Sequence, residues 1–231
     1  MSENAQNNNI PAHIAIIPDG NRRWARNKSL PIFNGHEKGF GVFRSIAEKA
    51  FVLGVKVLSV WVFSTENWNR DKSEVEYLMK YFIKYFKAEA EPMNKQGIKV
   101  IVSGSKDRLP EELLTAINNI EQLTVNNSHG ILNICLNYGG RQEIVDAVNH
   151  MLQEKPTQIG PEDIRKHLYH DLPDVDLIIR TSGERRLSGF MPWLGGYAEL
   201  HFIEKHWPDF NPTDLEQAVA DYQARQRRFG K

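Results

Sequence analysis

The strongest constraint on the fold of this chain is a regular alternation of short apolar runs with longer helical patterns. Runs rich in branched and aromatic residues predict buried strands at 13–18, 55–64, 99–103, 131–136, 177–180 and 198–203. Helical periodicity predicts helices at 35–53, 73–95 with a break near Pro92, 110–125, 142–153, 160–169 and 213–228. Strands that alternate with helices pair in parallel beneath helices on both faces. The pattern therefore predicts a single α/β domain with a central, mainly parallel six-stranded sheet.

Length and composition are typical of one folded domain preceded by a short tail. A chain of 231 residues suits one large domain, and no repeat or linker divides it. Residues 1–12 begin with a polar, asparagine-rich stretch and are expected to be disordered, whereas residues 13–231 form the domain. The N-terminus does not resemble a signal peptide, and no apolar run reaches the roughly 20 residues that span a bilayer. These features predict a cytoplasmic protein.

The charge balance argues against a nucleic-acid partner. Lysine plus arginine and aspartate plus glutamate both total 29 residues, so no global field attracts a polyanion. Any anion site must therefore come from a local cluster of arginines. Cys135 is the single cysteine, which excludes an intrachain disulfide and suits a reducing compartment.

Polar clusters directly follow three of the predicted strands. They occupy residues 19–23 after the first strand, 64–70 after the second and 180–188 after the fifth. Ligands of parallel α/β sheets bind beyond the carboxyl ends of the strands. The three clusters are therefore expected to contribute to one binding site, whatever family the chain belongs to.

The first cluster combines a carboxylate with glycine and arginines. Asp19 at a strand end, followed by Gly20, suits an anion held beside a divalent cation. Arg22 and Arg23 add charge-assisted donors for phosphate oxygens. An ordinary Asp-Gly turn with two solvated arginines is the alternative.

The second cluster packs a hydroxyl, an amide, an aromatic ring and an arginine into one loop. Asn67 is positioned to orient a substrate group, Ser64 to bond a phosphate, and Arg70 to pair with Glu74. A capped helix start with surface polar residues is the alternative reading.

The third cluster places three arginines and three hydroxyls around Gly183, which is typical of a diphosphate cradle. Further along, Glu199 lies among apolar neighbours, where a carboxylate needs a cation or a hydrogen-bonding partner. An ion pair with an arginine is the alternative for Glu199. His36 is a candidate to touch phosphate or to shuttle a proton, and a capping or core role is equally open.

Five segments, in this order and at this spacing, strongly resemble the motifs of the cis-prenyltransferase family, and its bacterial undecaprenyl diphosphate synthases most of all. They are the segments at 13–25, 63–68, 137–141, 179–184 and 207–210. The resemblance runs from about residue 13 to residue 230. It implies a homodimer, a hydrophobic tunnel, a Mg²⁺ cofactor and two substrates, isopentenyl diphosphate and an allylic diphosphate such as farnesyl diphosphate.

The resemblance also implies roles for individual residues. Asp19 and Asn67 are the expected catalytic residues, and Asp19 and Glu199 are the expected metal ligands. The expected substrate-binding residues are Gly20, Asn21, Arg22, Arg23, Trp24, His36, Ser64, Thr65, Glu66, Trp68, Arg70, Arg180, Arg186 and Ser188. The Arg228–Gly230 segment resembles a C-terminal element that reaches the partner subunit's site.

The implied activity is cis-prenyl chain elongation, which condenses isopentenyl diphosphate with the allylic diphosphate to give a polyprenyl diphosphate. Val62 stands where long-chain relatives often have alanine, so a product shorter than undecaprenyl is predicted. Ile32 stands where many relatives carry an arginine, and Arg22 is expected to supply the missing donor. Two alternatives stay open: a non-catalytic or partner-dependent subunit of a heteromeric enzyme, and a diphosphate-binding module. Release of a lipid product favours transient contact with a membrane.

Overall fold

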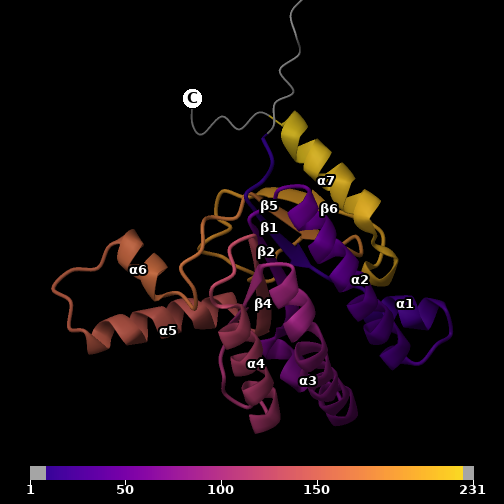
Figure 1. Ribbon diagram of the computed structural model, residues 1–231, viewed down its shortest axis with the longest axis horizontal. Coiled ribbons are helices and arrows are strands. Elements are labelled where there is room, and N and C mark those ends of the chain that lie inside the picture. The colour runs from indigo at the N-terminus through magenta and orange to yellow at the C-terminus, as the bar shows by residue number, and fades with distance from the viewer. Residues whose placement is uncertain (1–8, 226–231) are drawn as a thin grey trace, which may run out of the picture.

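The computed structural model describes residues 9–225, which form one α/β domain built on a single six-stranded sheet (Figure 1). The strand order is β3-β4-β2-β1-β5-β6, and every neighbouring pair is parallel. The strands are β1 (His13–Ile17), β2 (Val57–Ser64), β3 (Ile98–Ser103), β4 (Gly130–Tyr138), β5 (Leu177–Arg180) and β6 (Glu199–Phe202). This architecture confirms the predicted fold class.

Helices follow the strands much as the periodicity predicts. They are α1 (Asn21–Asn27), α2 (Ile32–Val52), α3 (Lys72–Lys95), α4 (Glu111–Thr124), α5 (Gly140–Gln153), α6 (Pro161–His167) and α7 (Pro212–Ala224), with 3₁₀ turns η1 (Thr65–Asn69) and η2 (Trp207–Asp209). The expected break near Pro92 is wrong, because α3 continues past it to Lys95. Pro92 lies so close to the helix end that only the last turn follows it.

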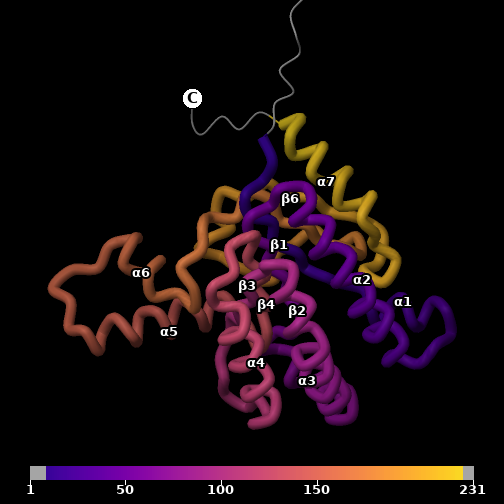
Figure 2. The backbone as a smooth tube through the Cα atoms, in the orientation of Figure 1, coloured from indigo at the N-terminus to yellow at the C-terminus, as the bar shows by residue number. Residues whose placement is uncertain are grey.

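Apolar helix faces cover the sheet on both sides. One core packs α2, α3, α4 and α7 against the sheet and contains Phe43, Phe82 and Leu215. The other core lies under α5 and the segment around Phe190. In Figure 2, α5 and α6 project to the side of the sheet away from α1 and α2. Because both faces are covered, β1 and β5 are buried along their whole length.

The strand register brings the predicted clusters to one edge of the sheet. β1 lies between β2 and β5, with Ile16 beside Val60 and Ile17 beside Arg180. The loops that follow β1, β2 and β5 therefore leave the sheet at neighbouring positions.

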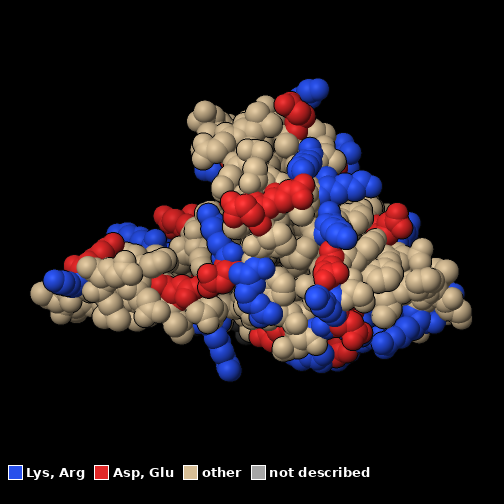
Figure 3. Space-filling model, turned by 90° about the horizontal axis from the view of Figure 1, so that it is seen from below, with Lys and Arg blue, Asp and Glu red and all other residues tan. Residues whose placement is uncertain are grey.

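The surface of the domain carries charges of both signs (Figure 3). Acidic and basic side chains are interspersed over the face seen in Figure 3. Over residues 9–225, no helix is long and apolar enough to cross a bilayer. Most of the predicted tail, residues 1–8, and the Arg228–Gly230 segment lie outside the described residues.

Candidate active site

A cavity of about 670 Å³ opens at the carboxyl ends of β1, β2 and β5. Residues from all three polar clusters line it, as the sequence analysis expects. The predicted site residues in its wall are Asp19, Gly20, Asn21, Arg22, Arg23, His36, Ser64, Glu66, Asn67, Arg70, Arg180 and Ser188. Its size is that of a cavity for a small organic ligand.

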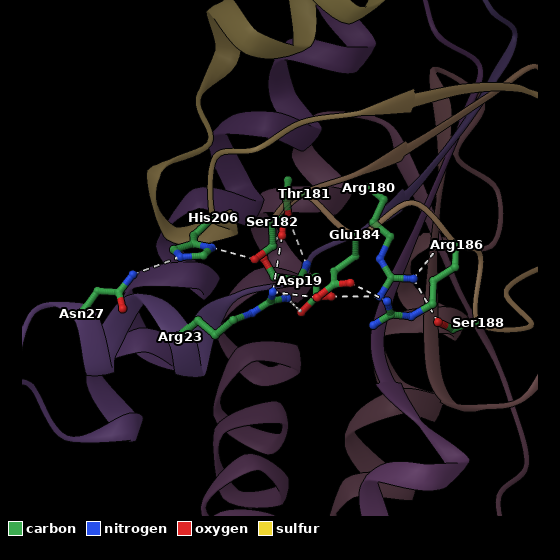
Figure 4. Close-up of polar contacts among 10 residues, drawn as sticks. All are labelled: Asp19, Arg23, Asn27, Arg180, Thr181, Ser182, Glu184, Arg186, Ser188 and His206. Carbon is green, nitrogen blue, oxygen red and sulfur yellow. Dashed lines mark hydrogen bonds and ion pairs between the residues drawn. The ribbon is translucent and has the colours of Figure 1, made fainter.

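Asp19 lies at the mouth of the cavity between two arginines (Figure 4). Its Oδ2 accepts from Arg180 Nη2 at 2.9 Å, and its Oδ1 is 3.1 Å from Arg23 Nη2. Burial alone would raise the pKa of Asp19, but the hydrogen bonds from Arg180 and Arg23 outweigh burial and lower the pKa below its ordinary value. The carboxylate is therefore ionised at neutral pH.

The backbone around Asp19 is held from two directions. The Asp19 amide donates to Thr181 Oγ1 at 2.9 Å, and the Thr181 hydroxyl donates back to the Asp19 carbonyl at 2.8 Å. The Trp207 amide donates to the same carbonyl at 3.0 Å. These bonds attach the end of β1 to the loops that follow β5 and β6, so the carboxylate has a preorganised position.

Arg180 joins the carboxylate to the third cluster. Its side chain is only 5% exposed, and Nη1 donates to Ser188 Oγ at 2.9 Å and to the Arg186 carbonyl. Its Nε is buried and has no hydrogen-bond partner in the described part of the chain. Ser182 and Ser188 hold left-handed backbone, with φ of +81° and +53°. A buried, unpaired guanidinium donor and local strain are features of a site built for an anion.

Arg23 and Arg186 share a second carboxylate. Arg23 Nη1 is 2.7 Å from Glu184 Oε1, and Arg186 pairs with the other oxygen of Glu184 (Figure 4). Together with Arg180 and Asp19, the cluster has three guanidinium groups and two carboxylates. The net positive charge of this cluster favours binding of a phosphate group.

Gly20 allows the first cluster to approach the loop after β5. It has a φ of +101°, and a Cβ there would lie 2.5 Å from Ser182 Oγ and 2.7 Å from His206 Nδ1. Ser182 Oγ is hydrogen bonded to His206 Nδ1 at 2.6 Å, and Asn27 Nδ2 lies 3.3 Å from the other ring nitrogen. Only glycine combines this conformation with so close an approach.

A second buried ionic cluster is centred on Glu74, and its partners His36, Arg70 and Arg22 line the cavity. Glu74 is 4% exposed and its Oε1 contacts His36 Nε2 at 3.1 Å and Arg70 Nη1 at 3.0 Å, while Arg22 Nε is 3.8 Å from Oε2. Burial would raise the pKa of Glu74, but His36, Arg70 and Arg22 lower it below its ordinary value. Burial lowers the pKa of Arg70 in spite of its pairing with Glu74. The predicted pair of Arg70 with Glu74 is confirmed.

Asn67 lies in η1, within the second polar cluster. Its Oδ1 accepts from the Ser64 amide at 3.1 Å, which fixes the start of η1. Its Nδ2 has no partner within residues 9–225 and belongs to the lining of the cavity. The free amide group is available to a ligand.

Four of the expected substrate-binding residues lie outside the cavity lining: Trp24, Thr65, Trp68 and Arg186. Trp68 Nε1 donates to Asn137 Oδ1 at 2.7 Å, and Arg108 stacks on its ring at 4.4 Å from the centroid. Its indole is therefore directed toward the carboxyl end of β4 and the loop after β3.

Within one chain, Glu199 does not lie near Asp19. It begins β6 and pairs in register with Leu177, whereas the site lies beyond Arg180 at the other end of β5. Three residues of strand separate these levels, which is about 10 Å. Glu199 Oε2 instead accepts from Arg225 Nη1 at 2.7 Å, so it has the arginine partner that was the alternative to a cation. The expected pair of metal ligands does not form in this chain.

The donors at the mouth still fit a magnesium ion carried by a diphosphate. Over residues 9–225, no three His, Cys, Asp or Glu side chains are grouped to hold a metal. Mg²⁺ commonly takes one or two carboxylates and completes its shell with phosphate oxygens and water. Asp19 supplies an ionised carboxylate beside anion-binding arginines, which matches that mode.

Sequence reasoning missed the apolar part of the wall and one polar support, His206. Phe40, Phe43 and Leu78 line the inner end, but their helical spacing marks them only as core residues. Thr181 belongs to the third predicted cluster, but its bond to the Asp19 backbone was not predicted. His206 acts through a contact between distant loops, for which the sequence has no local signal.

Comparison with known proteins agrees with the geometry of the site. Residues 17–230 match the family model described as "Putative undecaprenyl diphosphate synthase". An isoprenyl transferase of Fusobacterium nucleatum subsp. nucleatum is 48% identical over 222 residues, covering 96% of both chains. The crystal structure of lavandulyl diphosphate synthase from Lavandula x intermedia with dimethylallyl diphosphate matches with a TM-score of 0.92 at 35% identity, covering 96% of this chain and 99% of the other.

A third comparison is with a bacterial crystal structure. A probable undecaprenyl diphosphate synthase from Campylobacter jejuni matches with a TM-score of 0.83 at 26% identity, covering 96% of this chain and all of the other. Sequence and fold thus agree over nearly the full length. The chain belongs to the undecaprenyl diphosphate synthase family of prenyltransferases.

Proposed function

We propose that this protein is a Mg²⁺-dependent cis-prenyltransferase that condenses isopentenyl diphosphate with an allylic diphosphate. The observation that carries the proposal is the ionised Asp19, held by Arg180 and Arg23 at the mouth of a cavity whose inner end is apolar. A diphosphate ester of a prenyl alcohol has the same division into a charged head and an apolar chain.

The arginines at the mouth supply the electrostatic part of the mechanism. Loss of the allylic diphosphate leaves carbocation character on the prenyl chain and accumulates negative charge on the departing group. Arg180 and Arg23 are fixed before the reaction by Asp19 and Glu184, so they stabilise this charge without reorganisation. Magnesium bound with the diphosphate would add Lewis-acid stabilisation of the same leaving group.

The second substrate then attacks through its double bond and loses a proton to form the new alkene. Asn67, whose Nδ2 is free, would orient the diphosphate or the reacting carbon of isopentenyl diphosphate. The apolar inner wall receives the prenyl chain and excludes water from the cation. Arg22 lines the cavity beside Glu74, which supports the hypothesis that it donates to the allylic diphosphate.

The relatives support this substrate class. One structural neighbour was crystallised with dimethylallyl diphosphate, and the family description names undecaprenyl diphosphate synthesis. A homodimer, a cytoplasmic location with transient membrane contact, and a metal role for Glu199 remain predictions. If Glu199 does bind metal, the other ligands come from a second copy of the chain or from substrate.

The test is an incorporation assay on purified protein with labelled isopentenyl diphosphate and dimethylallyl, geranyl or farnesyl diphosphate. Incorporation that needs both magnesium and Asp19 is expected, so chelation and Asp19→Ala should each abolish it. Tight diphosphate binding without turnover would support the binding-module alternative. Turnover that appears only after addition of a second polypeptide would support the partner-dependent subunit.

A further inference from the structure

His206 lies between the last residue of α1 and the loop that follows β5 (Figure 4). Its Nδ1 is 2.6 Å from Ser182 Oγ, and its Nε2 is 3.3 Å from Asn27 Nδ2. Because Asn27 Nδ2 can only donate, Nε2 accepts this bond and Nδ1–H donates to Ser182 Oγ. The two nitrogens of one imidazole therefore join α1 to the loop after β5.

The same segment also contacts the start of α1. Gly20 precedes the helix, and a Cβ at this position would lie 2.7 Å from His206 Nδ1, so the ring packs directly on the glycine. The neighbouring Trp207 amide donates to the carbonyl of Asp19 at 3.0 Å. Residues 206–207 thus hold α1 at both its first and its last turn.

The helix held in this way carries two cations of the cavity wall. Arg22 and Arg23 belong to α1 and line the cavity, whereas His206 and Ser182 are not part of its lining. Arg23 Nη1 reaches the loop after β5 at Glu184 Oε1, 2.7 Å away, and at the Ser182 carbonyl, 3.4 Å away. The side chain of Arg23 is 40% exposed, and ion pairs of exposed side chains contribute little to stability. The arginine contacts alone therefore attach α1 only weakly, and a further anchor is needed.

We infer that His206 is a positioning residue for the diphosphate site, because its bond to Ser182 fixes α1, with Arg22 and Arg23, against the loop after β5. Cations that are fixed before binding cost no ordering free energy when the ligand arrives. Without the imidazole, the buried Ser182 hydroxyl loses its partner and α1 loses its anchor. Loss of His206 therefore weakens diphosphate binding although no group that contacts the ligand is removed. The inference rests on the proposed function for the identity of that ligand.

The first experiment measures the affinity of the purified protein for inorganic diphosphate with Mg²⁺ by calorimetry, which needs no turnover. His206→Ala should weaken binding about tenfold. His206→Asn places an amide N–H close to the position of Nδ1 and should restore most of the affinity, whereas His206→Gln places it close to Nε2 and should not. His201→Ala is the matched control, because this imidazole pairs with Asp221 of α7 at 3.5 Å and lies outside the cavity lining.

A double variant tests the bond itself. Ser182→Ala removes the same bond from its other side, so it should weaken diphosphate binding about as much as His206→Ala. The two substitutions together should cost no more affinity than either one alone, and additive losses would contradict the assigned bond. Urea unfolding of each variant checks that the protein is fully folded under the conditions of the binding assay.

Steady-state kinetics provide a second readout that depends on the proposed function. His206→Ala should raise KM for the allylic diphosphate about tenfold and leave KM for isopentenyl diphosphate nearly unchanged, because Arg22 and Arg23 are proposed to hold the allylic group. Equal changes in both KM values would contradict a role specific to α1. An inactive wild type would refute the proposed function, and the calorimetric test of His206 would still stand.

Four calorimetric results would overturn the inference. They are unchanged affinity in His206→Ala, an equal loss in His201→Ala, a loss in His206→Asn as large as in His206→Ala, and no binding of diphosphate to the wild type.

Discussion

At the scale of single residues, the site is organised by the mutual neutralisation of buried charges. Asp19 is ionised because Arg180 and Arg23 hold it, and Glu74 is ionised because His36 and Arg70 hold it. Each carboxylate therefore positions the cations that a diphosphate needs. Removing one member leaves the others buried and unpaired, which costs more than the pair itself contributes.

The role of Arg180 as a planar, forked donor can be tested by Arg180→Lys. A lysine keeps the charge but cannot reach Asp19 and Ser188 together, as Arg180 does at 2.9 Å to each. We expect kcat/KM to fall about 100-fold, which corresponds to about 2.7 kcal/mol. The control is Arg186→Lys, since Arg186 has a largely exposed side chain and pairs with Glu184. Equal losses of kcat/KM in the two variants would contradict a specific role for the forked guanidinium of Arg180.

The buried pair of Glu74 and Arg70 should behave as a coupled unit in stability. Glu74→Gln leaves the largely buried Arg70 cation without its partner, so we expect the free energy of unfolding in urea to drop by about 2 kcal/mol. Adding Arg70→Met to Glu74→Gln should recover part of that loss. Additive losses in the double variant would show that the two side chains do not interact energetically.

At the scale of elements, the sequence predicts where each strand and helix lies, but the positions of side chains within the site depend on register. The three clusters meet as expected because each follows a strand end, and all neighbouring strands are parallel. Glu199 was predicted inside a strand, but only the pairing of β6 with β5 shows that it lies at the opposite end of β5 from Arg180. Trp68 follows β2 as predicted, yet its direction depends on Asn137, far along the chain.

Close packing of α1 on α2 depends on the absence of a side chain at Gly35. A Cβ at Gly35 would lie 2.1 Å from the carbonyl oxygen of Asn21, so Gly35→Ala forces the helices apart. We expect a loss of about 2–3 kcal/mol in the free energy of unfolding, measured in urea. Gly41→Ala in the same helix is the matched control, because nothing lies within 4 Å of its Cβ. That control should be neutral or stabilising by up to about 1 kcal/mol, because alanine has the higher helix propensity. A similar loss in Gly41→Ala would show that the contact with Asn21 is not the cause of the loss in Gly35→Ala.

At the scale of the whole molecule, a chain of buried polar side chains connects four adjacent strands of the sheet. His13 Nε2 is bonded to Ser59 Oγ at 2.8 Å, Asn133 Nδ2 donates to the same oxygen at 3.0 Å, and Ser103 Oγ donates to Asn133 Oδ1 at 2.8 Å. These contacts join β1, β2, β4 and β3 in spatial order. Such a fully bonded network favours one strand register over others, although none of its members stands out in the sequence.

The network predicts how stability depends on pH. Burial lowers the pKa of His13 to about 4 from an ordinary 6.5, so the folded protein keeps it neutral while the unfolded chain takes up a proton below pH 6.5. Stability is thus fully present above pH 6.5 and falls as the pH drops toward 4, by about 2 kcal/mol between pH 7 and pH 5. Urea unfolding at both pH values measures the loss, and His13→Gln should lose correspondingly less. Since His170 and His201 also have lowered pKa values, the difference between wild type and variant isolates His13. An identical loss in both proteins would show that His13 is not the group that links protonation to unfolding.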